Sequence, residues 1–196
     1  GKILLRGDFS QIEVRIFAHF TQDPALLAAY PWVGEERDVH ASAAEILFGS
    51  TDAHHRTIAK NCTFALMYGA EATKIGETAG LPASEAAGFL KVFRERMPSL
   101  LAWKPQIAKQ LAGVGYLETP WGWRGYFPAF WSPLFSERQA ALREAANFPI
   151  QASAAGFFKK WWLEADKIIH KYSQRAILQV HDELLFEIRK ELVGDW

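Results

Sequence analysis

Residues 51–69 read TDAHHRTIAKNCTFALMYG, a run whose composition favours a helix. Four side chains recur in it at every fourth position: Arg56, Lys60, Phe64 and Tyr68. At about 100° per residue, this spacing places two cations and two aromatic rings along one slowly drifting stripe. Guanidinium and ammonium groups bind phosphate oxygens, and aromatic rings stack on bases. The stripe therefore suits a nucleoside triphosphate, although a solvated helix face that merges into the core would show the same spacing.

Two acidic residues near opposite ends of the chain lie beside predicted strands. The segment KILLRGDFSQIEVRIFAHF, residues 2–20, predicts a strand that ends at Asp8 and then an amphipathic helix from about Ser10. The segment AILQVHDELLFEI, residues 176–188, predicts two strands joined tightly at His181, Asp182 and Glu183. If these strands share a sheet, Asp8 and Asp182 would bind two Mg²⁺ ions about 4 Å apart, as in phosphoryl transfer. Taken singly, Asp8 is more typical of a cap on the following helix, and Asp182 is more typical of a turn residue.

The length and composition are those expected of a compact soluble protein. The 196 residues are 49% hydrophobic, and none of the apolar runs approaches the roughly 20 residues that cross a bilayer. Because 22 Lys and Arg balance 22 Asp and Glu, the net charge does not favour nucleic acid. The single cysteine, Cys62, makes no internal disulfide and is expected to be a buried apolar side chain. We expect a cytoplasmic protein without membrane contact, and the start at Gly1 indicates a piece of something longer.

Three motifs resemble those of family A DNA polymerases, the bacterial and phage Pol I-like class. They are DFSQIEVRIFAHF at 8–20, the RxxxKxxxFxxxYG run at 56–69 and QVHDELLFE at 179–187. Further similarity lies in DVHASAAEILFG at 38–49, TPWGWR at 119–124 and REAANFPIQASAAG at 143–156, so the resemblance covers nearly the whole chain. It implies an α+β fold, in which a palm with a small antiparallel sheet and flanking helices carries a helical fingers subdomain. Residues 1–30 and 113–196 would form the palm and residues 31–112 the fingers, with thumb and exonuclease regions absent.

The resemblance also implies roles at a catalytic and nucleotide site. Asp8 and Asp182 would bind two Mg²⁺ ions with Glu183 in support, and Lys60 would protonate or neutralise the departing pyrophosphate. The incoming dNTP would be contacted by Arg56, Lys60 and His40 at the triphosphate, by Phe64 at the base, and by Gln11 and Glu13 at the sugar, with Tyr68 near the template base. The bulk of Glu13 would exclude a 2′-hydroxyl.

Primer and template contacts are implied for a further set of residues. These are Arg143, Asn147 and Gln151, spaced four apart on a predicted helix, together with His181 at the primer end. Simpler readings stay open for several side chains. His40 is also explained as a first-turn residue after Asp38, and Glu13 as a local partner of Arg15. The three residues spaced four apart would equally form an ordinary polar helix face.

The sequence therefore predicts a template-directed DNA polymerase that adds dNMP from dNTP to a primer 3′-hydroxyl, present as a truncated or split catalytic core. Its partners would be primer–template DNA, dNTPs and a separate N-terminal polymerase or exonuclease chain. One alternative is a single-subunit RNA-polymerase-like enzyme, which Glu13 and Phe64 argue against. The other is a catalytically silent nucleic-acid-binding fragment, which the intact Asp8, Lys60 and Asp182 argue against.

Two segments depart from the family pattern. After Lys60 the family usually has Asn-Phe-Gly, whereas this chain has Thr63-Phe64-Ala65, which adds a methyl group where glycine allows close approach. After Gln151 the usual Gly-Thr-Ala-Ala-Asp becomes Ala-Ser-Ala-Ala-Gly, so Gly156 stands where the family has a carboxylate.

Overall fold

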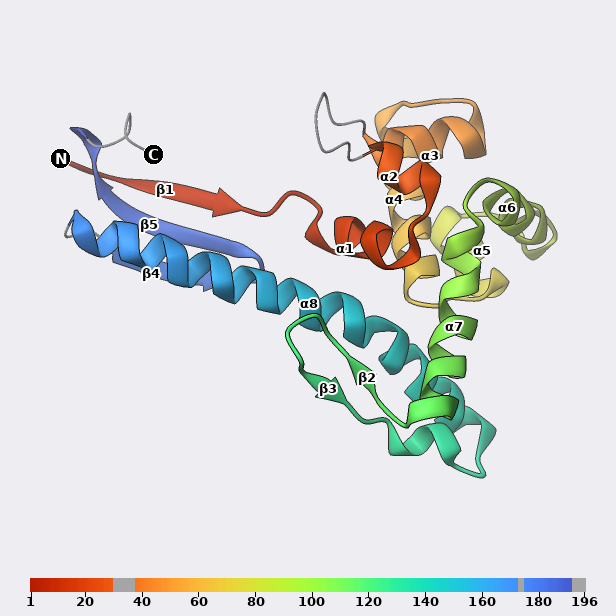
Figure 1. Cartoon of the computed structure of the whole chain (residues 1–196). Coiled ribbons are helices and arrows are strands. Elements are labelled where there is room, and N and C mark those ends of the chain that lie inside the picture. The colour runs from red at the N-terminus through yellow and green to blue at the C-terminus, as the bar shows by residue number, and fades with distance from the viewer. Residues whose placement is uncertain (30–37, 173–174, 192–196) are drawn as a thin grey trace.

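A single long helix, α8 (Phe135–Lys171), joins a small sheet at one end of the molecule to a group of helices at the other (Figure 1). The structure is a computed structural model and describes residues 1–29, 38–172 and 175–191. The strands are β1 (Lys2–Asp8), β2 (Leu117–Glu118), β3 (Arg124–Gly125), β4 (Arg175–Val180) and β5 (Glu183–Arg189). The other helices are α1 (Ile12–Thr21), α2 (Pro24–Ala29), α3 (Val39–Phe48), α4 (Ala53–Met67), α5 (Ala72–Ala79), α6 (Ala83–Arg96) and α7 (Pro98–Val114), with a 3₁₀ turn, η1 (Pro128–Trp131), before α8.

Carboxylates immediately before α3 and α4 accept backbone hydrogen bonds and explain where these helices begin. The Asp38 carboxylate accepts from the backbone N–H groups of His40 and Ala41, and Asp52 accepts from His54 and His55. Each carboxylate satisfies donors that the first helical turn leaves without partners. The hydrogen bond from the His55 backbone and further bonds from Ser50 and the His55 ring lower the pKa of Asp52. Both caps are local in sequence, so the starts of α3 and α4 are determined by residues next to them.

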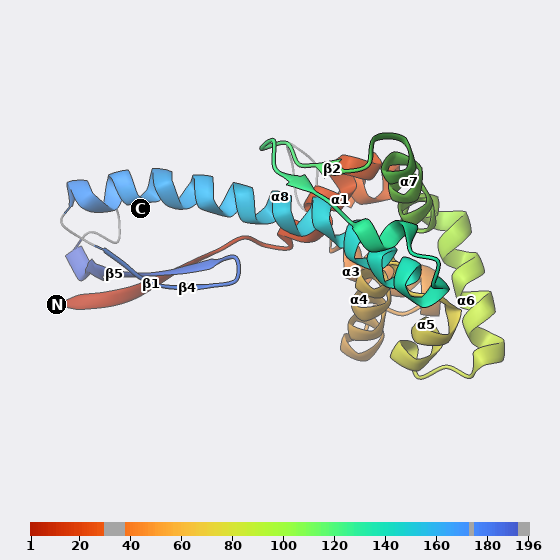
Figure 2. The same cartoon turned by 90° about the horizontal axis from the view of Figure 1, so that it is seen from below.

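The sheet brings the two ends of the chain together. Its strand order is β1–β5–β4, and both pairs are antiparallel. Alternate residues of β5, namely Leu184, Phe186 and Ile188, are buried, as expected for a sheet with one covered face. They pack against α8 and form what we call the small core, made of Phe158, Ala165, Ile169, Leu184, Phe186 and Ile188. Figure 2 shows α8 lying along this sheet.

A second and larger cluster, the large core, fills the helical end of the molecule. It includes buried side chains from α1, α4, α5, α6, α7 and the first half of α8. The indole N–H of Trp103 on α7 donates to the backbone oxygen of Ala146 on α8, at 2.9 Å. Asp23 is buried before α2 and accepts a hydrogen bond from the Ser99 hydroxyl at the start of α7. Hydrogen bonds between helices therefore add to the apolar contacts that hold the helices together.

The α+β class predicted from the sequence is confirmed. The segment between α7 and α8 contains the antiparallel β2–β3 pair, and residues 135–171 form the single helix α8. The first helix starts at Ile12 and not at residue 10, because Gln11 has a left-handed backbone with φ of 53°. Cys62 is buried, and this burial raises the pKa of its thiol to about 11. The predicted boundary at residues 30–31 lies outside the described residues.

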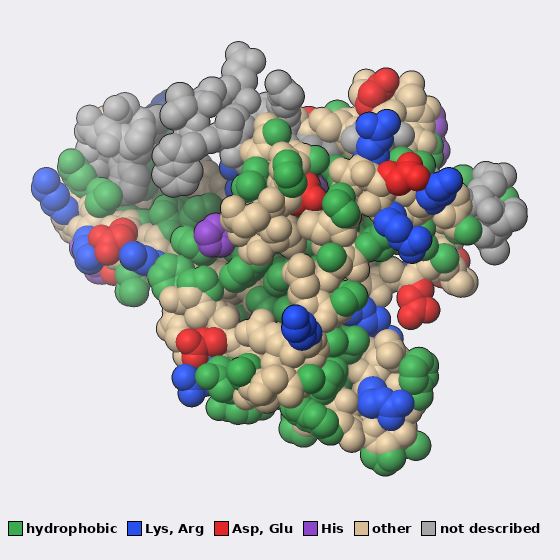
Figure 3. Space-filling view, turned by 45° about the vertical axis from the view of Figure 1, so that its right-hand side comes forward, with side chains coloured by type: hydrophobic (Ala, Val, Ile, Leu, Met, Phe, Trp, Pro, Cys, Tyr) green, Lys and Arg blue, Asp and Glu red, His purple; other side chains and the backbone are tan. Residues whose placement is uncertain are grey.

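The surface carries interspersed charges. Across the face in Figure 3, hydrophobic side chains gather in the middle and charged side chains of both signs lie mainly around them. None of the helices in the described ranges is long and apolar enough to cross a membrane.

Candidate active site

A cavity of about 500 Å³ lies where the start of α1, α4, α8 and the β4–β5 turn meet. These segments are far apart in sequence, and the two cores bring them together around α8. The cavity is lined by Gln11, Ile12, Glu13, Phe64, Gln151, Ala154, Ala155, Phe158, Lys159, Gln179, His181 and Asp182. Six of these are residues that the sequence nominated: Gln11, Glu13, Phe64, Gln151, His181 and Asp182.

A hydrogen bond between α1 and α4 fixes one wall of the cavity. The Tyr68 hydroxyl donates to the carboxylate of Glu13, and it also contacts the side chain of Gln151 on α8. Burial and the contact with Glu13 raise the pKa of Tyr68, so its hydroxyl stays protonated and acts as the donor. Three helices therefore meet at one polar cluster, in which Glu13 has a fixed position.

The predicted metal ligands lie on adjoining backbone segments. Asp8 at the end of β1 is the register partner of Glu183 at the start of β5, and the Phe9 N–H donates to the Asp182 backbone oxygen at 3.3 Å. Arg6 lies beside them, with its Nε 2.8 Å from Glu183 and its Nη2 3.4 Å from Asp8. Asp182 lines the cavity, whereas Asp8 is exposed at the strand end and is not among the lining residues.

This donor set suits a hard divalent cation. Carboxylate oxygens are the ligands that Mg²⁺ prefers, and Mg²⁺ usually keeps several waters or takes substrate phosphates as further ligands. In the described ranges, His, Cys, Asp and Glu side chains form no group of three or more that would hold a metal ion by themselves. Asp8 and Asp182 would therefore need water, backbone or phosphate oxygens to complete a metal site.

The three residues predicted to bind the triphosphate are not among the residues that line the cavity. Arg56 donates from Nε to the Asp38 carboxylate at 2.5 Å, while Lys60 is exposed. Burial opposes ionisation of Asp38, but the hydrogen bonds from Arg56, Ala41 and His40 outweigh it and lower its pKa. The position of Arg56 on α4 agrees with the predicted stripe, but its guanidinium is engaged by α3.

His40 is buried, with its ring centroid 5.8 Å from that of Phe64. Neither ring nitrogen has a hydrogen-bond partner among the described residues. Burial lowers the pKa of His40 to about 4, and the nearby cations Lys60 and Arg56 act in the same direction against the carboxylate of Asp38. His40 is thus neutral at pH 7 and occupies the first turn of α3 after Asp38, the simpler of its two sequence readings.

The three residues predicted to contact primer and template are on α8, and one of them reaches the cavity. Gln151 lines it, while Arg143 is exposed elsewhere on the helix. The side-chain oxygen of Asn147 is buried and has no hydrogen-bond partner in the described part of the chain. Of these three residues, Gln151 is the one that lines the cavity, and the contacts of all three with primer and template stay a prediction.

Lys159 and Gln179 line the cavity although the sequence analysis assigned them no part in the site. Lys159 follows Gln151 by two helical turns, so extending the spacing that nominated Gln151 would have found it. Its ammonium nitrogen lies 4.7 Å from the ring centroid of Trp123, in the connection from β2 to β3. The Gln179 side chain donates to the backbone oxygen of His181 at 3.2 Å, a contact that depends on the turn and has no sequence signal.

The structure explains one of the two departures from the family pattern. A Cβ atom at Gly156 would lie 2.0 Å from Nε1 of Trp121, and Trp121 in turn donates to the Ser153 backbone oxygen at 3.2 Å. Any side chain at position 156, including a carboxylate, would displace this indole. Ala65 is half-buried beside the large core, and nothing in the structure explains its replacement of glycine.

Comparison with known proteins shows the family of the chain. Residues 1–195 match the family described as DNA polymerase family A. The chain is 36% identical over 199 residues to DNA polymerase I of Pseudomonas aeruginosa, covering 98% of this chain and 22% of that protein. It is 33% identical over 195 residues to the thermostable DNA polymerase I of Thermus aquaticus, covering 97% of this chain and 23% of that protein.

A solved structure is also similar: the POL domain of Pol1 from M. smegmatis in complex with DNA primer–template and dNTP. The TM-score is 0.88 at 31% identity, and the match covers 98% of this chain and 34% of the other. The chain thus spans between a fifth and a quarter of the length of the two curated relatives. With its motifs, fold and sequence all in agreement, the chain belongs to DNA polymerase family A.

Proposed function

We propose that this chain is the palm and fingers part of a DNA-directed DNA polymerase. The primer 3′-hydroxyl attacks the α-phosphate of a dNTP, and pyrophosphate leaves. The observation that carries the proposal is the cavity that gathers Glu13, Phe64, Gln151 and Asp182 from four distant segments. The relatives are named DNA polymerase I, and the similar solved structure was determined with DNA primer–template and dNTP.

Asp8 and Asp182 are the proposed ligands of two Mg²⁺ ions. Bound there, Mg²⁺ would activate the attacking hydroxyl and stabilise the leaving oxygen. The two carboxylates stand at adjoining ends of β1 and the β4–β5 turn, and Glu183 is the register partner of Asp8. Arg6 is next to both Asp8 and Glu183 and balances part of their negative charge.

The proposed triphosphate contacts come from α3 and α4. Lys60 is exposed and free to reach a phosphate, where it would donate a proton to the departing pyrophosphate. Arg56 would exchange the single hydrogen bond from its Nε to the Asp38 carboxylate for a phosphate, which can accept two hydrogen bonds from a guanidinium and carries more charge. His40 is buried, so its contact with phosphate requires α3 and α4 to move apart.

The proposed base and sugar contacts are at the cavity wall. Phe64 would stack on the incoming base, and Tyr68 would lie near the template base. Glu13 would exclude ribonucleotides by its bulk, since its carboxylate is held in place by Tyr68, and Gln11 precedes it beside the sugar. Gln151 and His181 would contact the primer–template, with Arg143 and Asn147 further along α8.

The test is extension of a labelled primer on a DNA template with Mg²⁺ and either dNTPs or rNTPs. Wild type is compared with Asp182→Asn and with Asp166→Asn, a control on α8 outside the cavity. A second set of reactions adds, as a separate chain, the part of the Pseudomonas aeruginosa relative that precedes the matched region. We expect extension with dNTPs in one set or both, loss in Asp182→Asn and no loss in Asp166→Asn.

Three other outcomes would contradict the proposal. Extension with rNTPs would favour the RNA-polymerase-like alternative. DNA binding without extension in either set would favour a silent nucleic-acid-binding fragment. Equal extension by wild type and Asp182→Asn would remove the assigned carboxylate from the chemistry.

A further inference from the structure

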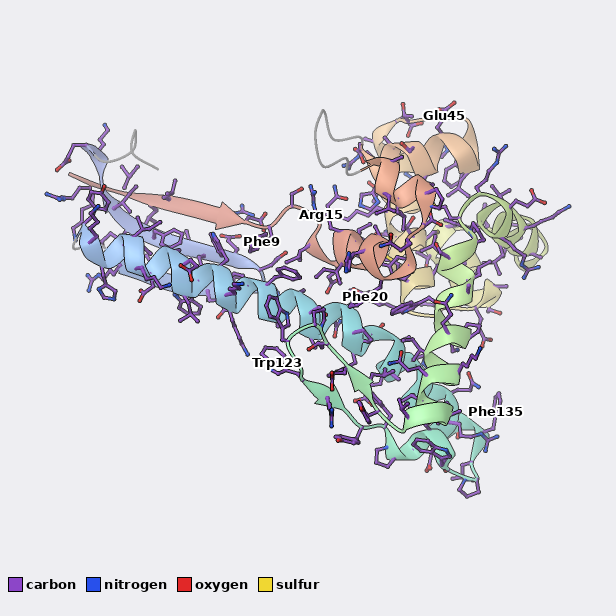
Figure 4. The ribbon with its side chains drawn as sticks, viewed as in Figure 1. Phe9, Arg15, Phe20, Glu45, Trp123 and Phe135 are labelled. Atoms are coloured by element: carbon purple, nitrogen blue, oxygen red, sulfur yellow. The ribbon has the colours of Figure 1, made fainter. Side chains whose placement is uncertain are left out.

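A second cavity lies on the other side of the contact between α1 and α8. Its volume is about 360 Å³, and it is lined by Phe9, Ile12, Arg15, Ile16, His19, Phe20, Pro120, Ser153 and Phe157. The α1 residues that line the candidate active site are Gln11, Ile12 and Glu13, so Ile12 alone of the lining residues borders both cavities. Figure 4 shows Phe9, Arg15 and Phe20 along this part of the chain. The second cavity is therefore a neighbour of the first and not an extension of it.

The walls of the second cavity are mostly apolar and aromatic. Phe157 is held by Trp121, whose ring centroid is 4.9 Å away, and Phe9 by Trp161 at 5.1 Å. Phe20 is partly buried against the large core, where it stacks on Trp103 at 6.0 Å. Each ring thus has a fixed neighbour behind it, so the rings offer an edge or face to the cavity without having to reorganise. Preformed cavities of a few hundred Å³ with such walls are typical of small-molecule sites.

Three polar groups border these apolar walls. The Ser153 hydroxyl is completely buried and has no hydrogen-bond partner among the described residues. Such a group costs free energy unless something enters to bond with it. Arg15 and His19 line the same cavity, and none of the described lining residues is acidic. The Nε of Arg15 is fixed by the Ser10 backbone oxygen at 2.7 Å, which places its positive charge at this wall.

We propose that this second cavity binds a small aromatic anion. The ring system would lie between Phe20, Ile16 and Phe157, and its acidic group would face Arg15. An oxygen or nitrogen of the ligand would accept a hydrogen bond from Ser153. The proposal rests on the lining residues of this cavity alone and stands or falls independently of polymerase activity.

The probe for the test is 1-anilinonaphthalene-8-sulfonate, an aromatic anion whose fluorescence rises in apolar surroundings. Its neutral counterpart is N-phenyl-1-naphthylamine, which lacks the sulfonate. The full chain is titrated with both compounds in wild type, Phe157→Ala, Phe135→Ala and Arg15→Gln. Phe135 is the matched control, because it is also an exposed phenylalanine of α8 but does not line the cavity.

We expect saturable binding of the anion to wild type. Phe157→Ala should weaken it about tenfold, which corresponds to the loss of one well-packed aromatic contact. Phe135→Ala should leave it unchanged. Arg15→Gln should weaken binding of the anion several-fold and leave binding of the neutral amine unchanged, because only the anion interacts with the guanidinium.

A second measurement guards against a variant that loosens the fold. In NMR spectra of wild type labelled at isoleucine methyl groups, the anion should shift the signals of Ile12 and Ile16. The signals of Ile107 in the large core and Ile188 in the small core should not move. The proposal is overturned if wild type shows no saturable binding, if the Phe157 and Phe135 variants behave alike, or if the shifts fall outside the second cavity.

Discussion

The large core and the small core pack against the same helix, α8, but they are assembled in different ways. The large core draws mainly on helices that follow one another along the chain; of these, α4 is capped by the preceding residue Asp52, and the adjoining helix α3 is capped in the same way by Asp38. The small core depends on β1 and β5, which lie at opposite ends of the chain. Local signals can therefore specify the first, whereas the second exists only once the whole chain has folded.

The two cores also differ in how well they are covered. In the small core one face of the sheet meets α8, while Leu4 on β1 and Leu178 on β4 are 63% and 52% exposed. The large core is enclosed by helices on several sides. The candidate active site lies between the two, so its geometry depends on both.

The largest effects are expected from Phe186→Ala in the small core and Phe93→Ala in the large core. Both rings are buried, so each truncation should lower the free energy of unfolding by about 3–5 kcal/mol. Hydrogen exchange should distinguish them: Phe186→Ala should raise exchange mainly in β1, β4 and β5, and Phe93→Ala mainly in α4 to α7. Equal increases throughout the chain in both variants would mean that the two cores unfold as one unit.

The folding stability of the chain should depend on pH because of His40, which lies in α3. Its pKa is about 4 in the folded chain and about 6.5 when unfolded, so the unfolded state takes up the proton first. Stability is therefore complete above pH 6.5 and falls as the pH drops toward 4, by up to about 3 kcal/mol. Urea unfolding at pH 7 and pH 4.5 measures this loss.

The pH-dependent loss should be smaller in His40→Phe than in wild type. His170→Phe, which changes an exposed histidine of α8, should retain the full loss. Identical pH dependence in wild type and His40→Phe would show that the burial of this imidazole does not control acid stability.

A smaller effect is expected at the connection between the β2–β3 hairpin and α8. Gly156→Ala should destabilise the chain by about 1–3 kcal/mol, because its Cβ would overlap the indole of Trp121. Gly88→Ala in α6 is the matched control: nothing lies within 4 Å of its new Cβ, and the change should stabilise the helix by about 0.5–1 kcal/mol. Chemical unfolding measures both, and a stabilising Gly156→Ala would rule out the close packing of Trp121.

The smallest expected effect concerns Glu13, which lines the candidate active site between the large core and the small core. If its carboxylate excludes a 2′-hydroxyl, Glu13→Ala should raise ribonucleotide incorporation relative to deoxyribonucleotide by at least about tenfold. Glu45→Ala, at an exposed position of α3, should not change the ratio. Single-turnover extension with each nucleotide gives the two rates, and an unchanged ratio in Glu13→Ala would assign the exclusion to another group.

The sequence was sufficient where structure depends on near neighbours. The strand over residues 2–8, the helices 39–48 and 53–67 and the turn at His181 follow from alternation, caps and breakers. The motifs also nominated six of the residues that line the candidate active site. What could not be predicted depends on distant contacts. These are the burial of His40 against Phe64, the engagement of Arg56 by Asp38, and the fit of Trp121 over Gly156.

The central claim is that Asp8 and Asp182, from the two ends of the chain, share one metal site. Manganese is a paramagnetic substitute for Mg²⁺, so electron paramagnetic resonance can measure its binding with dNTP present in wild type, Asp8→Asn, Asp182→Asn and the double variant. Shared ligation predicts that either single change weakens binding strongly and that the double change adds less than the sum of the two. Undiminished binding in either single variant, or fully additive losses, would contradict the claim.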